Sequence, residues 1–328
     1  MGSATIVDVA RAAGVSKTTA SDALRGHGRV SEATRVAVAE AAASLGYTIN
    51  RSARSLRTAT TGAIGLYVPQ VIFRSEYYLS FVYGVANEAA KAEYDVTLIM
   101  SGQLPSHGHL PNVDGIVLCD PVASDPVVRG LMATGLAVVT CERYNGDRVP
   151  NGVIWSDHAA YLEQLLDELA GADARHPAML ASTTVSDWSI SLVQKYRSWC
   201  LARGIEPVIR EVPFGTDPAA LQDTTLQFLQ ENPTVDALVC AADGVAAAAI
   251  PAIRLHGRTI GEDFLLASCV DGTSMRIADP AITAIDTKGG EAGSECARLL
   301  FELLDGSTPE GTVREMPLEL NQRASTGA

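Results

Sequence analysis

The first 47 residues carry apolar positions at helical spacing. A first helix is predicted by apolar side chains that recur every three or four residues, namely Ile6, Val9, Ala10 and Ala13. Residue types that cap or end helices stand at the boundaries of three such runs: Thr5, Gly14, Ser16 and Ser31. The three helices are expected near 5–13, 16–25 and 31–45. A tight turn after the first helix is typical of a helix-turn-helix unit, and a plain three-helix bundle would give the same pattern.

From residue 61 onward the pattern changes to an alternation of strands and helices. Buried strands are predicted from short apolar runs at 63–68, 96–100, 115–119, 136–141, 178–182, 208–212, 237–241 and 265–270. Helices are predicted between most of them, at 77–93, 126–134, 157–170, 187–203, 218–231, 244–256 and 290–304. This order is typical of the α/β class, with parallel sheets and crossover helices. About 265 residues are enough for two lobes.

Charge is distributed unevenly along the chain. Residues 1–60 carry eight basic and four acidic side chains, whereas the remainder carries 17 basic and 34 acidic ones, and the net charge is −13. A cationic segment on an acidic chain suggests a polyanionic partner for that segment, because lysine and arginine neutralise phosphates. A surplus of four charges would also fit an ordinary solvated face.

Several short motifs occur in a fixed order along these elements. They include Thr5-Ile6-Val7-Asp8-Val9-Ala10, Ala13-Gly14-Val15-Ser16, Val30-Ser31, Leu45-Gly46-Tyr47, Val113-Asp114-Gly115-Ile116 and Arg323-Ala324-Ser325-Thr326. In order and spacing the chain resembles the LacI/GalR family of bacterial transcriptional regulators, strongly at the front and more loosely after residue 70. The resemblance implies a DNA-binding headpiece at 1–48, a hinge at 49–60 and an effector-binding and dimerisation domain at 61–328.

The resemblance assigns roles to headpiece residues position by position. Base contacts are implied for three side chains of the second helix: Lys17, Thr18 and Asp22. Contacts to the DNA backbone are implied for Thr5, Ser16, Thr19, Ser21, Arg25, Ser31, Thr34, Tyr47 and Asn50. The family usually has arginine where this chain has Asp22. Because a carboxylate accepts from cytosine and cannot donate to guanine, we expect a different base preference there.

The segment 50–57 resembles the family's hinge helix. The resemblance implies that it folds when two copies meet over the minor groove, with Leu56 as a wedge and Ala53 beside it. The arginines of the segment would face phosphates: Arg51, Arg54 and Arg57. Without the preceding headpiece, the same residues would read as a basic linker. Ile49 stands where the family usually has proline, which changes the entry to the hinge.

For the larger domain the resemblance implies a periplasmic-binding-protein-like architecture. Its first lobe would comprise about 61–158 and 287–312, and its second lobe about 159–286 and 313–328. The chain would therefore cross between lobes near 158, 286 and 313. Effectors in such folds bind beyond the carboxyl ends of the strands, in the cleft between the lobes.

Cleft residues are predicted with departures from the family. Asp271 and Asp243 match family acids, but the family's asparagine before the second of them is Ala242 here. Leu192 occupies the position of the family's ligand-binding arginine, and Arg197 is close enough to substitute for it. These losses suggest a less polar effector, or none.

Aromatic residues and one further acid are also candidates for the cleft. The aromatic candidates are Phe73, Tyr77, Trp155 and Trp188, each of which would fit core packing as well as ligand contact. Asp157 fits a ligand contact and a helix cap equally.

Other chemistry in the sequence is sparse. The six cysteines lie mostly in apolar runs without a C-x-x-C spacing, which predicts reduced, buried thiols. His107 and His109 lack a third ligand, so we expect no metal, and no motif predicts a cofactor or a catalytic group. No apolar segment suggests secretion or a membrane partner, so a cytoplasmic protein is expected. The last residues, 324–328, are expected to be loosely held.

The sequence thus predicts a transcriptional regulator, most simply a repressor, and no enzyme. It would bind a near-palindromic operator as a homodimer under control of a small-molecule effector such as a sugar. A solute-binding protein shares the two lobes but lacks a headpiece. An α/β enzyme would need a catalytic constellation, which the sequence does not offer.

Overall fold

The computed structural model describes residues 4–25, 28, 30–47, 60–70, 75–100, 112–183 and 185–327. The chain forms two compact units, Met1–Thr61 and Gly62–Ala328. Several predicted site residues fall outside the described ones, namely Asn50, Arg51, Ala53, Arg54, Leu56 and Phe73, as do His107 and His109. Among the residues described, every helix is too short or too polar to cross a membrane.

The small unit contains the three predicted helices, α1 (Ile6–Ala12), α2 (Lys17–Arg25) and α3 (Glu32–Ser44). The Thr5 amide donates to the Asp8 carboxylate over 3.0 Å, which forms the expected capping box. Gly14 has a φ of +65°, so it takes the left-handed conformation that ends α1. The core is small and made of six buried side chains from all three helices: Val9, Ala10, Ala20, Ala23, Val38 and Ala42.

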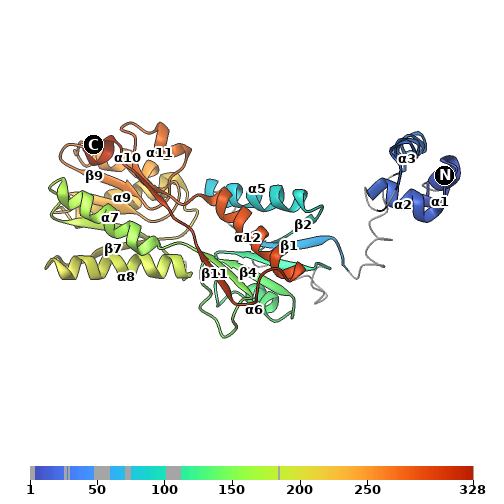
Figure 1. The fold of residues 1–328 in the computed structure, drawn as a ribbon. Helices are drawn as coiled ribbons and strands as arrows, with labels where there is room; N and C mark the ends of the chain where they lie inside the picture. Colours follow the sequence, from blue (N-terminus) through green and yellow to red (C-terminus); the bar gives the residue numbers. More distant parts are fainter. Residues whose placement is uncertain are drawn as a thin grey trace. The chain divides into compact units, whose positions relative to one another are not determined.

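The first lobe of the large unit is built on an entirely parallel six-stranded sheet (Figure 1). Its order is β11-β5-β4-β3-β1-β2. The strands are β1 (Ala63–Val68), β2 (Asp95–Met100), β3 (Gly115–Cys119), β4 (Ala137–Cys141), β5 (Gly152–Trp155) and β11 (Thr312–Glu315). The helices of this lobe are α5 (Glu76–Lys91), α6 (Pro126–Met132) and α12 (Gly289–Asp305).

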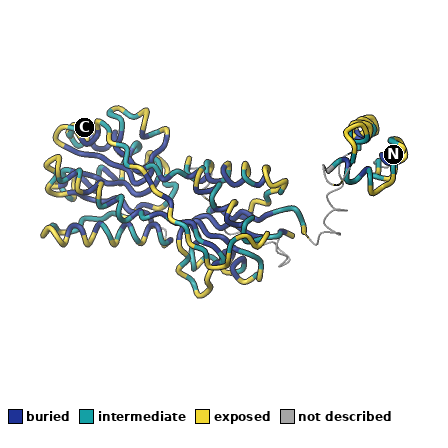
Figure 2. Tube along the Cα trace, viewed as in Figure 1, coloured by how far each residue is buried: buried dark blue, intermediate teal, exposed yellow. Residues whose placement is uncertain are grey.

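The second lobe is built on another six-stranded sheet, with the order β12-β10-β9-β8-β6-β7 and one antiparallel edge strand, β12. The strands are β6 (Pro177–Ser182), β7 (Val208–Val212), β8 (Ala237–Cys240), β9 (Leu265–Ser268), β10 (Thr283–Asp286) and β12 (Glu319–Asn321). The helices are α7 (His158–Gly171), α8 (Asp187–Ala202), α9 (Pro218–Glu231), α10 (Val245–Leu255) and α11 (Thr273–Ile277). Figure 2 shows the strands buried and the outer helix faces exposed, as crossover helices on parallel sheets require.

The chain passes between the lobes at three places among the described residues. The first passage follows β5, and the second lies between β10 and α12, close to the predicted positions. The third was expected near 313, but Val313 pairs with Val153 in the first sheet. This passage therefore lies after Glu315 and before Glu319, because β11 is a short strand that the apolar pattern did not reveal.

Helices α5 and α12 pack with their backbones in direct contact. A Cβ atom at Gly84 would overlap the carbonyl oxygen of Gly290, and one at Gly293 would overlap that of Phe81. Only glycine permits this approach, so the two helices form one closely packed pair. Because α12 follows the second passage between the lobes, this pair lies where the lobes are joined.

The C-terminal residues are more firmly held than expected. Ser325 is fully buried, donates to the carbonyl of Leu266 over 2.5 Å, and accepts from the amide of Thr283 over 2.9 Å. A short 3-10 helix, η2 (Ala324–Thr326), holds this serine in place. The expectation of a loose end was wrong for 324–326, because hydroxyl groups tie it to two strands. All six cysteines are free and buried, as predicted.

Candidate functional site

The second helix of the small unit carries the three predicted base-contacting residues. Lys17 and Thr18 are exposed, and Asp22 is half-buried. Because α2 is helical throughout, residues at these spacings lie on neighbouring positions of one face. The face follows the tight turn at Gly14, which is the arrangement of a recognition helix in a helix-turn-helix unit.

Many of the predicted DNA-backbone contacts are helix caps in this structure. Ser16 accepts from the amide of Thr19 over 3.0 Å, and Ser31 accepts from that of Thr34 over 3.3 Å. The hydroxyl groups of each pair are also bonded, at 2.8 Å. Capping alone explains these residue types, so their contacts to phosphate stay a prediction. Ser21 is half-buried, Tyr47 packs against the small core, and the side chain of Arg25 lies outside the described part of the chain.

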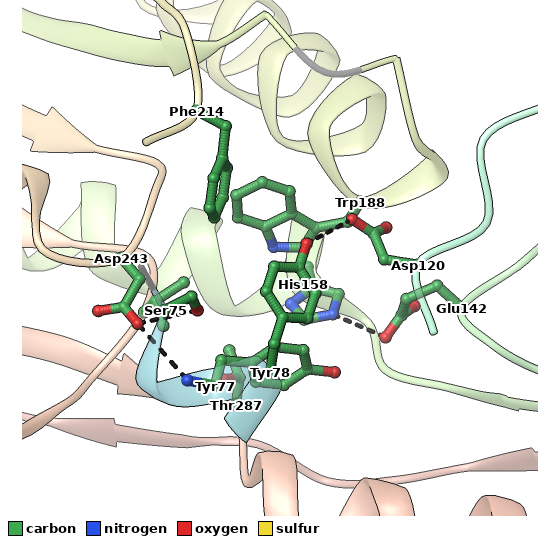
Figure 3. A pocket seen from close by; sticks show the side chains of 11 residues that line it. Ser75, Tyr77, Tyr78, Asp120, Glu142, His158, Trp188, Phe214, Asp243 and Thr287 are labelled. Atoms are coloured by element: carbon green, nitrogen blue, oxygen red, sulfur yellow. Dashed lines mark hydrogen bonds and ion pairs between the residues drawn. The ribbon is translucent and has the colours of Figure 1, made fainter. Parts of the chain in front are cut away.

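A cavity lies between the two lobes of the large unit (Figure 3). The first lobe lines it with Ser75, Tyr77, Tyr78, Asp120 and Glu142. The second lobe lines it with His158, Trp188, Phe214, Asp243 and Val270, and Thr287 borders it at the second passage. Most of these residues follow the carboxyl end of a strand, where α/β sheets place their ligands.

Two buried acids in the cavity belong to the first lobe. Asp120 follows β3 directly and Glu142 follows β4, and both have a positive φ, of 47° and 69°. Glu142 faces His158 of the second lobe at 3.0 Å, and both side chains are buried. This pair joins the two lobes through a charge-assisted contact when the histidine is protonated.

Asp120 has an unusual environment for a carboxylate. Tyr78 donates to its Oδ2 atom over 3.1 Å, whereas its buried Oδ1 atom has no hydrogen-bond partner among the described residues. Burial raises the pKa of Asp120 to about 6, and the negative charge of Glu142 adds to this effect, although the hydroxyl groups of Ser186 and Tyr78 oppose it. A ligand that donates a hydrogen bond here would satisfy an atom that the described residues leave unpaired.

Three of the predicted cleft residues line the cavity: Tyr77, Trp188 and Asp243. The ring of Tyr77 lies edge-on to that of Tyr78, with 5.4 Å between their centroids. Burial raises the pKa of Asp243, although hydrogen bonds from Ser75 and from backbone amides oppose the change. Figure 3 shows these groups converging on one space from both lobes.

The other described candidates lie elsewhere. Leu192 is 1% exposed and belongs to the core of the second lobe, so it does not replace the family's arginine as a ligand contact. Arg197 is exposed on α8 and is absent from the cavity lining, so it does not substitute. Asp157 accepts from the amide of Ala160 over 2.9 Å and therefore caps α7. Trp155 lies beneath the guanidinium of Arg143 at 3.7 Å.

Asp271 is engaged by the protein itself. Arg323 donates to its two carboxylate oxygens over 2.7 and 3.0 Å, and the amide of Gly272 donates to it as well. Burial by itself would raise the pKa of Asp271, but the hydrogen bonds and charge of Arg323 outweigh burial and lower it. Asp271 lies beside the cavity but is not among its lining residues.

Sequence reasoning missed several lining residues, most importantly Tyr78, Asp120, Glu142, His158 and Phe214. For the two acids a signal was available, since each directly follows a predicted buried strand. The described lining contains three carboxyl groups and four aromatic rings, and His158 is its one basic side chain. Such a site favours ligands that donate hydrogen bonds and disfavours anions.

A helix-turn-helix unit that is followed in the chain by a two-lobed α/β unit with an inter-lobe cavity defines a class, the ligand-responsive DNA-binding regulators. Residues 5–50 match the model of the bacterial regulatory proteins of the lacI family, and residues 166–326 match a periplasmic binding protein-like domain. The transcriptional regulator CelR of Thermobifida fusca is 30% identical, over 93% of each chain. The chain therefore belongs to the lacI family, and it is a DNA-binding transcriptional regulator.

Further similarities cover nearly the whole chain. The ribose operon repressor of Halalkalibacterium halodurans is 26% identical, over 98% of this chain and 97% of that protein. The structure of a CelR–cellobiose complex is 26% identical, with a TM-score of 0.71, and covers 98% of this chain and 99% of that one. The lac repressor dimer bound to operator is 22% identical, with a TM-score of 0.83 and full coverage of both chains, and shows the same fold.

Proposed function

We propose that the chain binds an operator as a homodimer and that a small molecule in the inter-lobe cavity controls this binding. The observation that carries the proposal is the cavity itself, because both lobes supply its polar and aromatic groups. A ligand that contacts both lobes stabilises one lobe arrangement over another, which is what an allosteric effector must do. The lac repressor dimer on its operator supports the DNA-bound form. We further propose that the protein binds its operator in the cytoplasm. We also propose that it is a regulator and not an enzyme.

The effector we propose is a neutral, hydroxyl-rich molecule such as a sugar. Aromatic faces of Trp188 and Phe214 would pack against the apolar face of a sugar ring, and Asp120 and Glu142 would accept from its hydroxyls. CelR binds cellobiose in a related structure, which supports this class. The missing arginine and asparagine at Leu192 and Ala242 leave acceptors in excess of donors, so sugar phosphates and sugar acids fit poorly.

The effector class is tested by calorimetric titration of the full chain with cellobiose, ribose and glucose 6-phosphate. We expect a neutral sugar to bind and to change the affinity for a selected operator, by about 5- to 150-fold. Asp120→Asn is expected to weaken the binding of that sugar. Binding of the phosphate alone, or no effect of any bound sugar on operator affinity, would contradict the proposal.

For base recognition we propose Lys17, Thr18 and Asp22, with the caps around them placed against phosphates. The opposite sign of Asp22 relative to the usual family arginine should change one position of each half-site. Selection of bound sequences from random DNA, with the natural chain and with Asp22→Arg, tests this assignment. An unchanged base preference would refute the role of Asp22.

The homodimer surface we propose is an apolar set on both lobes. It comprises Leu79 and Tyr83 of α5, Leu98 of β2, Leu255 of α10 and Ile277 of α11, and three of these are more than 70% exposed. Helices α5, α10 and α11 lie along the upper side of the large unit in Figure 1. Large apolar side chains exposed along one side mark an interaction surface, and twofold pairing along it would use both lobes.

A further inference from the structure

Asp243 of the second lobe caps a helix of the first lobe. Its Oδ2 atom accepts from the hydroxyl of Ser75 over 3.0 Å and from the amide of Glu76 over 2.8 Å. The amide of Tyr77 points to the same oxygen at 3.5 Å. These donors belong to the first turn of α5, whose amides have no partner within the helix. Dashed lines in Figure 3 join Asp243 to this turn.

Glu76 makes the reverse contact. One of its carboxylate oxygens accepts from the amide of Thr273 over 2.7 Å, and the other accepts from the hydroxyl of Thr273 over 3.0 Å. Thr273 begins α11 in the second lobe. A Cβ atom at Gly272 would lie 3.1 Å from the same carboxylate, so glycine leaves it room. Each lobe therefore places a carboxylate on the first amides of a helix in the other lobe.

These contacts exist only while the lobes are close together. Carboxylates on free helix amides form charge-assisted bonds, which are stronger than neutral ones. Opening the cleft breaks the contacts of both acids at once, because all of them join α5 to the second lobe. Two contacts that break together stabilise one state cooperatively.

We propose that Glu76 and Asp243 form a reciprocal clasp that holds the lobes closed and transmits the state of the cavity to α5. The proposal rests on the proposed function, because it names how that cavity is regulated. Asp243 lines the cavity, so a bound effector and the clasp share one carboxylate. Glu76 does not line it, so Glu76 acts on the effector only through closure.

Helix α5 connects the clasp to the rest of the first lobe. Its first turn bears the clasp, its next turns expose Leu79 and Tyr83, and Gly84 lies against α12. A change at the first turn is therefore felt along the proposed dimer surface and at the second passage between the lobes. No movement of a loop is needed, because α5 and α12 are packed backbone to backbone.

Hydrogen–deuterium exchange of the full chain without effector tests the clasp. Glu76→Gln removes one charge, and Glu206→Gln is the matched control at an exposed position with the same chemistry. We expect Glu76→Gln to speed exchange about fivefold at the Thr273 amide, which it touches, and also at the amides of 76 and 77, which only Asp243 caps. Asp243→Asn should show the reciprocal effect at Thr273.

The test depends on whether exchange at the Thr273 amide and at the amides of 76 and 77 changes together. If each variant changes exchange only at the amides it touches, or if Glu206→Gln has the same effect, the clasp is refuted. Titration with cellobiose and then with operator is a separate arm. If each variant speeds exchange at both sites but no sugar changes operator binding, the proposed effector class is refuted and the clasp stands. If a sugar controls operator binding but each variant affects only the site it touches, the clasp is refuted and the proposed effector class stands.

Discussion

Arg323 and Asp271 form a bidentate ion pair in the second lobe, with N–O distances of 2.7 and 3.0 Å. Arg323 follows the edge strand β12. The acid is 1% and the arginine 17% exposed at the side chain. Asn321 and Gly272 donate to the same carboxylate. The Arg-Ala-Ser-Thr motif at 323–326 therefore has a structural role. Arg323 binds Asp271, and Ser325 is hydrogen-bonded to β9 and β10.

Replacing Asp271 by asparagine is therefore expected to destabilise the large unit. It would leave the largely buried guanidinium of Arg323 without its counter-charge, at a cost of about 3 kcal/mol in the free energy of unfolding at pH 7. Urea denaturation measures this loss, and Asp263→Asn is a control at a more exposed pair. A loss no larger than that of the control would contradict the structural role.

The same pair predicts a pH dependence. Because the pKa of Asp271 is lowered in the folded state, its contribution to stability is complete above the unfolded-chain value and declines as the pH falls towards the folded value. The natural chain should therefore lose stability relative to Asp271→Asn as the pH falls below about 4. Unfolding curves at pH 3.5, 5 and 7 measure the difference.

The pH dependence of stability expected from Asp120 has the opposite sign. Its folded pKa of about 6 lies above the ordinary value of 3.8, so the folded state binds the proton more tightly. This stabilising contribution is complete below the unfolded value and is lost as the pH rises from about 4 to about 6. Asp120→Asn should therefore raise the free energy of unfolding at pH 7.5 by about 3 kcal/mol.

The control for this prediction is Asp147→Asn, at an exposed position of the same lobe. The gain should shrink as the pH falls and disappear near pH 3, where Asp120 is protonated in both the folded and the unfolded state. Glu142 and His158 face the same cavity and remain in both proteins, so the difference between the two curves isolates Asp120. An equal gain at both pH values would show that charge is not its cause.

The proposed dimer surface predicts a change in assembly. Tyr83→Asp on α5 and Leu255→Asp on α10 place charges on residues that are each 74% exposed, and both should give monomers in sedimentation experiments. Operator affinity should fall at least about tenfold, because two half-sites are no longer bound together. Leu201→Asp is the control, because Leu201 is 65% exposed and its helix, α8, lies along the lower side of the large unit in Figure 1. A dimer that survives both first variants would place the interface elsewhere.

The sequence predicted the architecture because its signals are local. Helix caps such as Ser31 and apolar runs such as 115–119 each determine one element, and the structure has those elements where they were expected. The strands that were missed, β5, β10, β11 and β12, have only three or four residues each, which is too short for a periodic signal. They form because a partner strand is already present.

The cavity was predicted less completely, because its members come together only through the two sheets. Asp120 and Glu142 are separated by 22 positions but follow neighbouring strands β3 and β4. Asp271 was a candidate on family grounds, yet Arg323, 52 residues later, already occupies its carboxylate. The clasp of Glu76 and Asp243 spans 167 residues and has no signal in a single sequence.

The close approach of α5 and α12 predicts a position where one methyl group is costly. Gly84→Ala would place a Cβ against the backbone of Gly290, which cannot retreat as a side chain would. We expect a loss of about 2 kcal/mol or more in the free energy of unfolding. Gly130→Ala on α6 is the matched control, because no atom lies within 4 Å of its added Cβ, and it should gain about 0.5–1 kcal/mol from helix propensity alone. If Gly84→Ala were equally harmless, the helices would be free to separate, and α5 could not carry the state of the clasp to α12.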